Sequence, residues 1–117
     1  MNTIGWAPSL TYFLIRKNDN KIIGMINLRY NLTEEIFAKG GSHIGYRIRP
    51  TERRKGYATY MLKEALIKCK ERGMGEVILG CYEDNFGSNK TIINNNGVLY
   101  KKSKMKDKDS LYYKINL

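Results

Sequence analysis

The chain has 117 residues, of which 42% are hydrophobic, and carries a formal net charge of +10. This length suits one domain spanning residues 1–117, with a packed core. No stretch approaches the roughly 20 apolar residues of a membrane span, and no basic segment followed by an apolar run opens the chain. A membrane helix and a secretory signal are therefore not predicted, and the protein is expected in the cytoplasm.

The charge admits three interpretations: a nucleic-acid partner, an acidic substrate, or solubility alone. Part of it comes from a lysine-rich run over residues 101–109, which acids interrupt. We expect this run to form a solvated hairpin loop. Because few aromatic residues are interleaved with the basic ones, the pattern argues against a base-stacking nucleic-acid surface.

Patterning predicts an alternation of strands and helices along the chain. The expected elements are strands over 10–17, 21–30 and 42–49, a helix over 56–72, a strand over 76–82, a weak helix over 86–95, and strands over 98–102 and 111–117. A polar connection at 31–41, containing Glu34 and Glu35, joins the first hairpin to the third strand. The strand–helix–strand unit at 42–82 predicts a parallel crossover inside an otherwise antiparallel sheet.

The helix expected over 56–72 has an apolar stripe with the helical period and charged residues opposite. Cys69 lies on that stripe, and Cys81 lies in a strand that is apolar on both faces. Both are expected to be buried, reduced thiols. One histidine and two cysteines form no metal-ligand cluster, so no metal is predicted.

The most informative segment is Arg53-Arg54-Lys55-Gly56-Tyr57-Ala58, between a strand and a helix. A helix N-terminus has free N–H groups and a partial positive charge. Gly56 has no side chain and allows a phosphate to approach the backbone. The spacing matches neither the Walker A motif nor the dinucleotide fingerprint. The segment is therefore interpreted as a phosphate-binding loop of another kind.

Arg53-x-x-Gly56-x-Ala58 resembles the Arg/Gln-x-x-Gly-x-Gly/Ala signature of the GNAT superfamily of N-acetyltransferases. Residues 44–50 resemble the family's fourth strand, residues 77–82 its fifth, and the segment from Asn85 to Gly97 its next helix and turn. The resemblance covers residues 10–117. It implies an α+β fold with a mixed, mostly antiparallel sheet, in which the fourth and fifth strands splay apart around the pantetheine arm of acetyl-CoA.

The family usually opens with a strand and one or two helices, and here about nine residues precede the first predicted strand. The chain is therefore interpreted as a short or N-terminally truncated form lacking those elements. They normally help to build the acceptor site, so their loss affects acceptor recognition more than cofactor binding. Apolar surface left around the first hairpin would favour a homodimer.

The resemblance and the loop chemistry together predict the acetyl-CoA site. Its expected residues are Ile48, Arg49, Arg53, Arg54, Lys55, Gly56, Tyr57, Ala58, Thr59, Asn85 and Ser88. The loop is expected to hold the pyrophosphate, and the edge of strand 44–49 is expected to bind pantetheine and, near Ile48, the thioester carbonyl. Asn85 and Ser88 are expected to contact pantetheine or to cap a helix.

The catalytic groups are predicted more loosely. A lysine-like amine, with a pKa of about 10.4, must lose a proton, and Glu83 is the candidate base, with a solvated loop carboxylate as the alternative. The family's usual acid is a tyrosine seven residues beyond the Asn, but that position is Ile92, so Tyr100 is the candidate acid. His43 is a candidate for the acceptor site. Tyr46 is assigned to core or cross-strand packing.

The sequence thus predicts an acetyl-CoA-dependent N-acetyltransferase acting on a small-molecule or peptide amine. The amine is expected to attack directly in a ternary complex, because the two buried thiols have no adjacent histidine. Two alternatives remain: a non-catalytic CoA-binding or protein-interaction module, and a basic nucleic-acid-binding domain.

Overall fold

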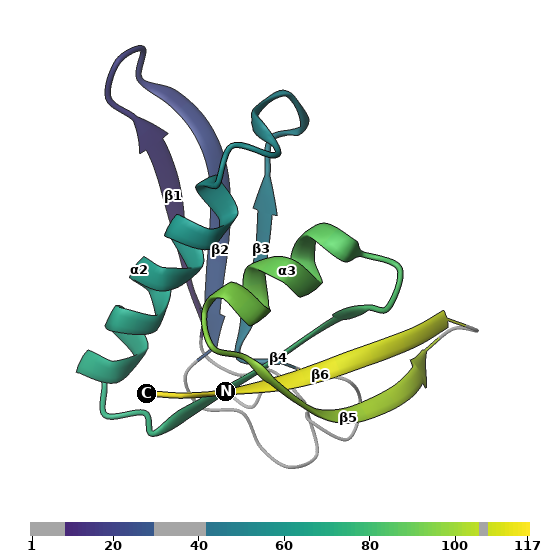
Figure 1. Ribbon diagram of the computed structural model, residues 1–117. Helices are drawn as coiled ribbons and strands as arrows, with labels where there is room; N and C mark the ends of the chain where they lie inside the picture. Colours follow the sequence, from purple (N-terminus) through teal and green to yellow (C-terminus); the bar gives the residue numbers. More distant parts are fainter. Residues whose placement is uncertain (1–8, 30–41, 106–107) are drawn as a thin grey trace, which may run out of the picture.

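Two antiparallel three-stranded sheets and two helices build the part of the chain that the computed structural model describes, residues 9–29, 42–105 and 108–117 (Figure 1). The elements are β1 (Ser9–Arg16), β2 (Lys21–Arg29), β3 (Ile44–Ile48), the 3-10 turn η1 (Pro50–Glu52), α2 (Tyr57–Glu71), β4 (Glu76–Tyr82), α3 (Phe86–Asn94), β5 (Val98–Met105) and β6 (Lys108–Asn116). The predicted connection at 31–41, with Glu34 and Glu35, lies outside the described residues.

The first sheet has the order β1-β2-β3 and packs against α2. Its register pairs Ser9 with Arg29 in the first hairpin and Gly24 with Ile48 in the second. The predicted helical stripe is confirmed, since Leu62 is fully buried and Cys69 is 1% exposed. Burying a side chain of the size of leucine contributes about 1.5–3 kcal/mol, so this contact holds the helix on the sheet.

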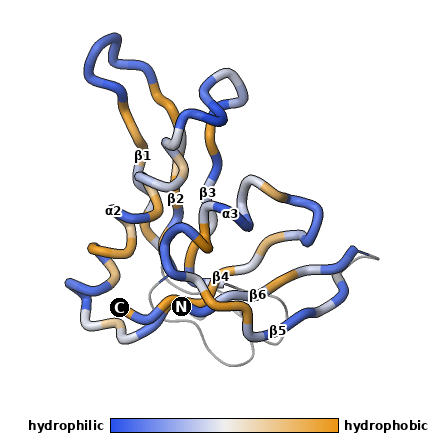
Figure 2. The backbone as a smooth tube through the Cα atoms, in the orientation of Figure 1, coloured by the Kyte–Doolittle hydropathy of each residue, from blue (hydrophilic) through white to orange (hydrophobic). Residues whose placement is uncertain are grey.

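The second sheet has the order β4-β6-β5, with Val77 opposite Ile115 and Leu79 opposite Tyr113. These residues join Ile92 of α3 and the α2 stripe in one core cluster. Hydrophobic segments accordingly run through both sheets, whereas the tip of the β1–β2 hairpin is hydrophilic (Figure 2). The two sheets and two helices therefore share one core.

The two sheets meet where β3 begins, beside β4, and then diverge (Figure 1). The His43 N–H donates to the Ile78 carbonyl (2.7 Å), and the Ile78 N–H donates to His43 Nδ1 (2.9 Å). Burial of His43 lowers its pKa. The strand–helix–strand unit is therefore present, and its two strands splay as the resemblance implies. The single mixed sheet expected from the sequence is divided at this junction into two hydrogen-bonded sheets.

The predicted loop over residues 101–109 is wrong. β5 continues to Met105 and β6 begins at Lys108, with Ser103 opposite Ser110. Strand pairing satisfies the backbone groups of the described part of this segment, and the side chains of Lys101, Lys102, Lys104 and Lys108 are exposed to solvent. Lysine-rich sequence therefore did not prevent a long hairpin.

The outer face of the first hairpin is apolar and exposed. Phe13, Ile15, Ile22 and Met25 lie there with 39% to 57% of their surface accessible. A homodimer through this face stays a prediction. Within the residues that the structure describes, no helix has the length and hydrophobicity of a membrane span.

Candidate active site

A tight loop links the first sheet to α2. β3 ends at Ile48, η1 follows, and the chain then passes through Arg54 and Gly56 with left-handed backbone angles (φ 63° and 83°) before α2 begins. Glycine adopts such angles at little cost, which explains Gly56. A Cβ atom at Gly56 would meet no heavy atom within 4 Å, so the loop backbone is open to an approaching group.

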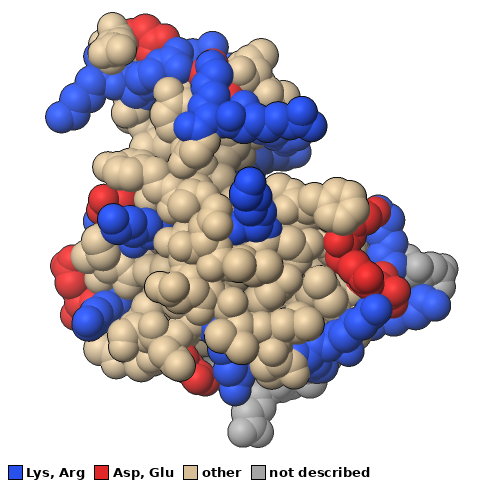
Figure 3. Space-filling view, viewed as in Figure 1, with Lys and Arg blue, Asp and Glu red and all other residues tan. Residues whose placement is uncertain are grey.

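The first turn of α2 is positively polarised. It contains no acidic residue, and the first N–H groups of a helix have no partner within the helix. Basic side chains from Arg53, Arg54 and Lys55 surround it, and Lys and Arg gather at this end of the molecule (Figure 3). Local charge and backbone polarity thus both favour an anion.

A cleft of about 1040 Å³ opens between this turn, β3 and α3. Of the residues expected to hold acetyl-CoA, those that line it are Ile48, Arg53, Arg54, Gly56, Tyr57, Ala58, Thr59, Asn85 and Ser88. The other two lie beside it: Arg49 donates from Nε to the Ile22 carbonyl, and Lys55 pairs with Glu52. The fold therefore brings the predicted loop and the predicted helix start to one cavity.

The free edge of β3 faces this cleft. The Arg49 N–H donates to the Ile23 carbonyl (2.7 Å) on β2. Because successive strand residues direct their N–H groups to opposite sides, the Ile48 N–H points away from β2. The Ile48 carbonyl also points away and accepts from Arg53 Nε (3.2 Å). A backbone donor is thus available where the sequence predicted one.

The start of α3 forms the opposite wall. Asn85 caps the helix, since its Oδ1 accepts from the Ser88 N–H (3.1 Å), which confirms the capping alternative. Ser88 Oγ shares a hydrogen bond of 2.7 Å with the Tyr46 hydroxyl, and both residues line the cleft. Burial raises the pKa of Tyr46. Tyr46 packs partly against the core, as expected, but its hydroxyl reaches the cleft wall.

Sequence reasoning gave Tyr46 no functional role, although a signal existed. Tyr46 lies two residues from both Ile44 and Ile48, the buried residues of β3, so all three side chains share one strand face and Tyr46 had to point toward the helices. Its partner Ser88 lies 42 residues further along the chain, and only the fold brings them together.

Glu52 was also missed. It is 4% exposed and lines the cleft, where Oε1 accepts from Arg16 (2.7 Å) and Lys55 (3.1 Å) and Oε2 from Lys21 (3.4 Å). Hydrogen bonds from Lys55 and then Arg16 lower the pKa of Glu52 to about 2, although burial opposes this. The carboxylate is therefore ionised at neutral pH, inside a site that otherwise attracts anions.

The two candidate catalytic residues do not line the cleft. Glu83 pairs with Lys102 (3.0 Å) and is about half exposed. Tyr100 lies on β5, with Lys114 Nζ 4.8 Å from its ring centroid, and burial raises its pKa. Ile92, at the place where the family has its tyrosine, is fully buried. The roles predicted for Glu83 and Tyr100 gain no support from their placement.

Both cysteines are free thiols. Cys81 Sγ donates to Asn89 Oδ1 (3.2 Å), which also accepts from the Tyr113 hydroxyl (2.6 Å). Burial raises the pKa of Cys69 and of Cys81. Thiols in this state are poor nucleophiles at neutral pH. Among the described residues, no three His, Cys, Asp or Glu side chains are grouped to hold a metal ion.

A family model described as the acetyltransferase (GNAT) family matches residues 2–92. The chain belongs to this family. No curated protein matches the sequence significantly.

Solved structures of GNAT proteins share this fold. A ribosomal-protein-S5-alanine acetyltransferase from Vibrio fischeri superposes with a TM-score of 0.77 at 18% identity, over 92% of this chain and 61% of its own. An acetyltransferase from Bacillus anthracis gives 0.75 at 22% identity, over 91% and 65%. The microcin C7 self-immunity acetyltransferase MccE, solved with acetyl-CoA and AMP, gives 0.72 at 21% identity, over 93% and 61%. The chain thus spans less than two thirds of these three structures.

Proposed function

We propose that this GNAT domain transfers an acetyl group from acetyl-CoA to a primary amine. The observation that carries the proposal is the cleft of about 1040 Å³, with a polarised helix start, Arg53 and Arg54 at one end and a free strand edge along its wall. Phosphates suit the first feature and an amide-rich arm suits the second. The amine acceptor is supported by the names of structural neighbours, which include a mutant spermidine N-acetyltransferase from Vibrio cholerae.

The N–H groups of Tyr57, Ala58 and Thr59 would bind the pyrophosphate, with Arg53 and Arg54 beside them. The Ile48 N–H would donate to the thioester carbonyl, and a donor of this kind contributes roughly 3 kcal/mol to the barrier reduction. Acetyl-CoA supplies the acetyl group already activated as a thioester. Binding both substrates in one cleft then favours reaction by proximity.

The chemistry would be direct. The amine nitrogen attacks the thioester carbon, the carbon–sulfur bond breaks, and the departing thiolate takes a proton. Tyr46 is the donor that the geometry favours, because its hydroxyl lines the cleft and its raised pKa keeps it protonated at neutral pH. The proton lost by the amine passes to water or to a carboxylate, for which Glu83 stays a candidate.

No acyl-cysteine is expected, since burial raises the pKa of both thiols. The free thiols also fit the reducing cytoplasm.

Two glycines that flank α2 allow a matched test of the binding step. Gly56 and Gly73 lie at opposite ends of the helix, each with φ of 83° and with open space where a Cβ atom would lie. Aspartate at either position meets the same backbone strain. Only at Gly56 would its carboxylate occupy and repel the phosphate site, whereas at the C-terminus of α2 it lies far along the helix axis.

We expect acetyl-CoA at about 100 times its dissociation constant to stabilise the wild-type protein by roughly 2.7 kcal/mol. Gly56→Asp should lose this stabilisation and Gly73→Asp should keep it, measured by thermal unfolding with and without acetyl-CoA. An unchanged response in Gly56→Asp would remove the loop from the proposal. Consumption of acetyl-CoA with a panel of amines then separates an enzyme from a non-catalytic CoA-binding module, which would bind without turnover.

A further inference from the structure

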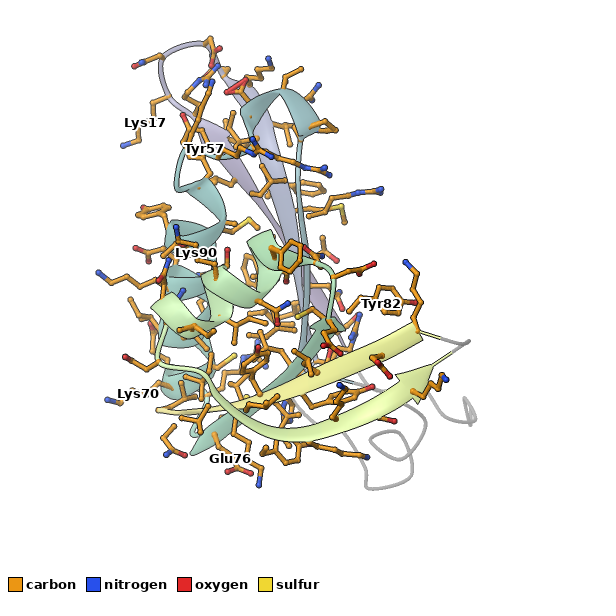
Figure 4. All side chains as sticks on the ribbon, turned by 45° about the vertical axis from the view of Figure 1, so that its right-hand side comes forward. Lys17, Tyr57, Lys70, Glu76, Tyr82 and Lys90 are labelled. Carbon is orange, nitrogen blue, oxygen red and sulfur yellow. The ribbon has the colours of Figure 1, made fainter. Side chains whose placement is uncertain are left out.

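One guanidinium spans both ends of the phosphate loop. Arg16, at the end of β1, donates from Nη1 to Glu52 Oε1 (2.7 Å) and to the Tyr57 hydroxyl (3.3 Å). Glu52 directly precedes the loop 53–56 and Tyr57 directly follows it. Tyr57 lies beneath the β1–β2 hairpin, among the side chains of its tip (Figure 4). The hairpin and the loop are therefore joined at the two points where the loop begins and ends.

The loop requires such support. Arg54, a residue with a side chain, has φ of 63°, and Gly56 follows with φ of 83°. Left-handed angles at a non-glycine residue persist only where the surroundings hold them. Successive N–H groups in such a conformation form a concave anion site. Anything that lets the loop relax would therefore remove the anion-binding shape.

The ion pairs of Glu52 also leave one cation available to a ligand. Arg16 and Lys55 share Oε1, at 2.7 Å and 3.1 Å, and the Lys55 side chain is 51% exposed. Arg16 is anchored a second time by Asp19, whose Oδ2 lies 2.7 Å from Nη2. Lys55 can thus turn toward a bound anion while Arg16 keeps the buried carboxylate paired, which avoids leaving an uncompensated charge.

We propose that Arg16 and Glu52 are positioning residues that clamp the loop 53–56 in its anion-binding conformation. The assignment of acetyl-CoA as the anion rests on the function proposed above. The clamp has an unusual consequence. Coulomb's law alone predicts that removing a carboxylate from an anion site tightens binding. If the carboxylate holds the loop, removing it weakens binding instead.

The sign of this change is the test. Glu52→Gln keeps one side-chain oxygen and removes the charge, and its matched control is Asp19→Asn, which makes the same change on the other carboxylate partner of Arg16. Asp19 lies in the turn of the β1–β2 hairpin, where its carboxylate accepts from the Arg16 side chain and the Lys21 N–H. Calorimetric titration with acetyl-CoA and, separately, with inorganic pyrophosphate gives the dissociation constants.

We expect Glu52→Gln to weaken both ligands about tenfold, comparable to the loss of a partner that orients a metal ligand, and Asp19→Asn to stay within about twofold. In steady-state assays KM for acetyl-CoA should rise with kcat nearly unchanged, because the clamp acts on binding. Tighter or unchanged binding in Glu52→Gln overturns the clamp, even if the variant is less stable. Equal weakening in both variants also overturns it.

A second variant decides the case if Glu52→Gln does not fold. Tyr57→Phe removes only the hydroxyl that Arg16 contacts, and it should weaken pyrophosphate by a few-fold without changing any charge; unaltered binding overturns the clamp. Wild-type protein that binds pyrophosphate but not acetyl-CoA rejects the proposed function while leaving the clamp to be decided by pyrophosphate. Wild-type protein that binds neither rejects both.

Discussion

Two charge clusters of similar chemistry lie beside the β1–β2 hairpin and the β5–β6 hairpin, and they differ in burial. The hairpin-tip cluster consists of Arg16, Asp19, Lys21, Glu52 and Lys55. The exposed cluster consists of Glu83, Asp84, Lys102, Lys108 and Asp109. The side chain of Glu52, at the centre of the first cluster, is 5% exposed, whereas the side chain of Glu83 is 49% exposed.

This difference decides what each cluster can do. Solvent screens the exposed pairs, which are worth little and leave the side chains free to move. Burial keeps the Glu52 pairs at fixed geometry, so they can hold a neighbouring loop. In Figure 3 red acidic atoms on the right-hand side lie next to blue basic atoms, apart from the basic end at the top. Clusters of acidic and basic side chains can thus serve different roles, and three predictions test that division.

The largest expected effect concerns turnover. If the exposed cluster is only a solvated surface, Glu83→Gln should leave kcat within about threefold, whereas Tyr46→Phe should lower it about 100-fold by removing a general acid. Both variants are compared in steady-state acetyl transfer to an amine that the wild-type protein uses. A 100-fold loss in Glu83→Gln would make Glu83 the base and break the comparison. Full activity in Tyr46→Phe would remove the tyrosine from the mechanism.

The next effect concerns stability. Glu52→Ala leaves Arg16 without its buried partner and should lower the urea midpoint clearly. Glu83→Ala should change the free energy of unfolding by no more than about 0.5 kcal/mol, as exposed pairs do. Urea titrations of the two variants at one pH give both values. Equal shifts would mean that burial does not distinguish the clusters.

The smallest effect is a change in acid sensitivity. The pKa of Glu52 is lowered from 4.5 to about 2, chiefly by Lys55 and Arg16, and the Arg16 hydrogen bond lowers the pKa of Asp19 to about 2. A lowered carboxyl pKa contributes stability that is complete above the ordinary pKa and is lost as pH falls toward the lowered one. Stability should therefore fall between about pH 4.5 and 2, and less steeply in Glu52→Gln.

Thermal unfolding measured at stepped pH checks this. Burial lowers the pKa of His43 from 6.5, so the stability that neutral His43 contributes is lost as pH falls below that value. This loss is expected to be equal in the wild type and in Glu52→Gln. The difference between wild type and Glu52→Gln then isolates the carboxylate. A difference that does not change with pH below 4.5 would show that Glu52 is not held in a charged, paired state.

The sequence by itself determined the local features of this protein. The amphipathic stripe predicted α2 within one residue at each end, and a glycine after three basic residues predicted an open, positively charged helix start. The capping role of Asn85 was also readable. These features depend on side-chain period and backbone propensity, which act between residues a few positions apart. Family membership followed from the same local motif in the expected order of elements.

Only the tertiary structure decided which distant residues meet in and beside the cleft. The pairs Arg16–Glu52 and Tyr46–Ser88 are separated by 36 and 42 residues, and no local pattern encodes either contact. The lysine-rich run forms strand for a related reason. Pairing between β5 and β6 supplies the backbone hydrogen bonds, and the composition of the run does not predict this pairing. Burial likewise separated Glu52 from Glu83, because whether a charge is screened or held depends on what the whole fold packs around it.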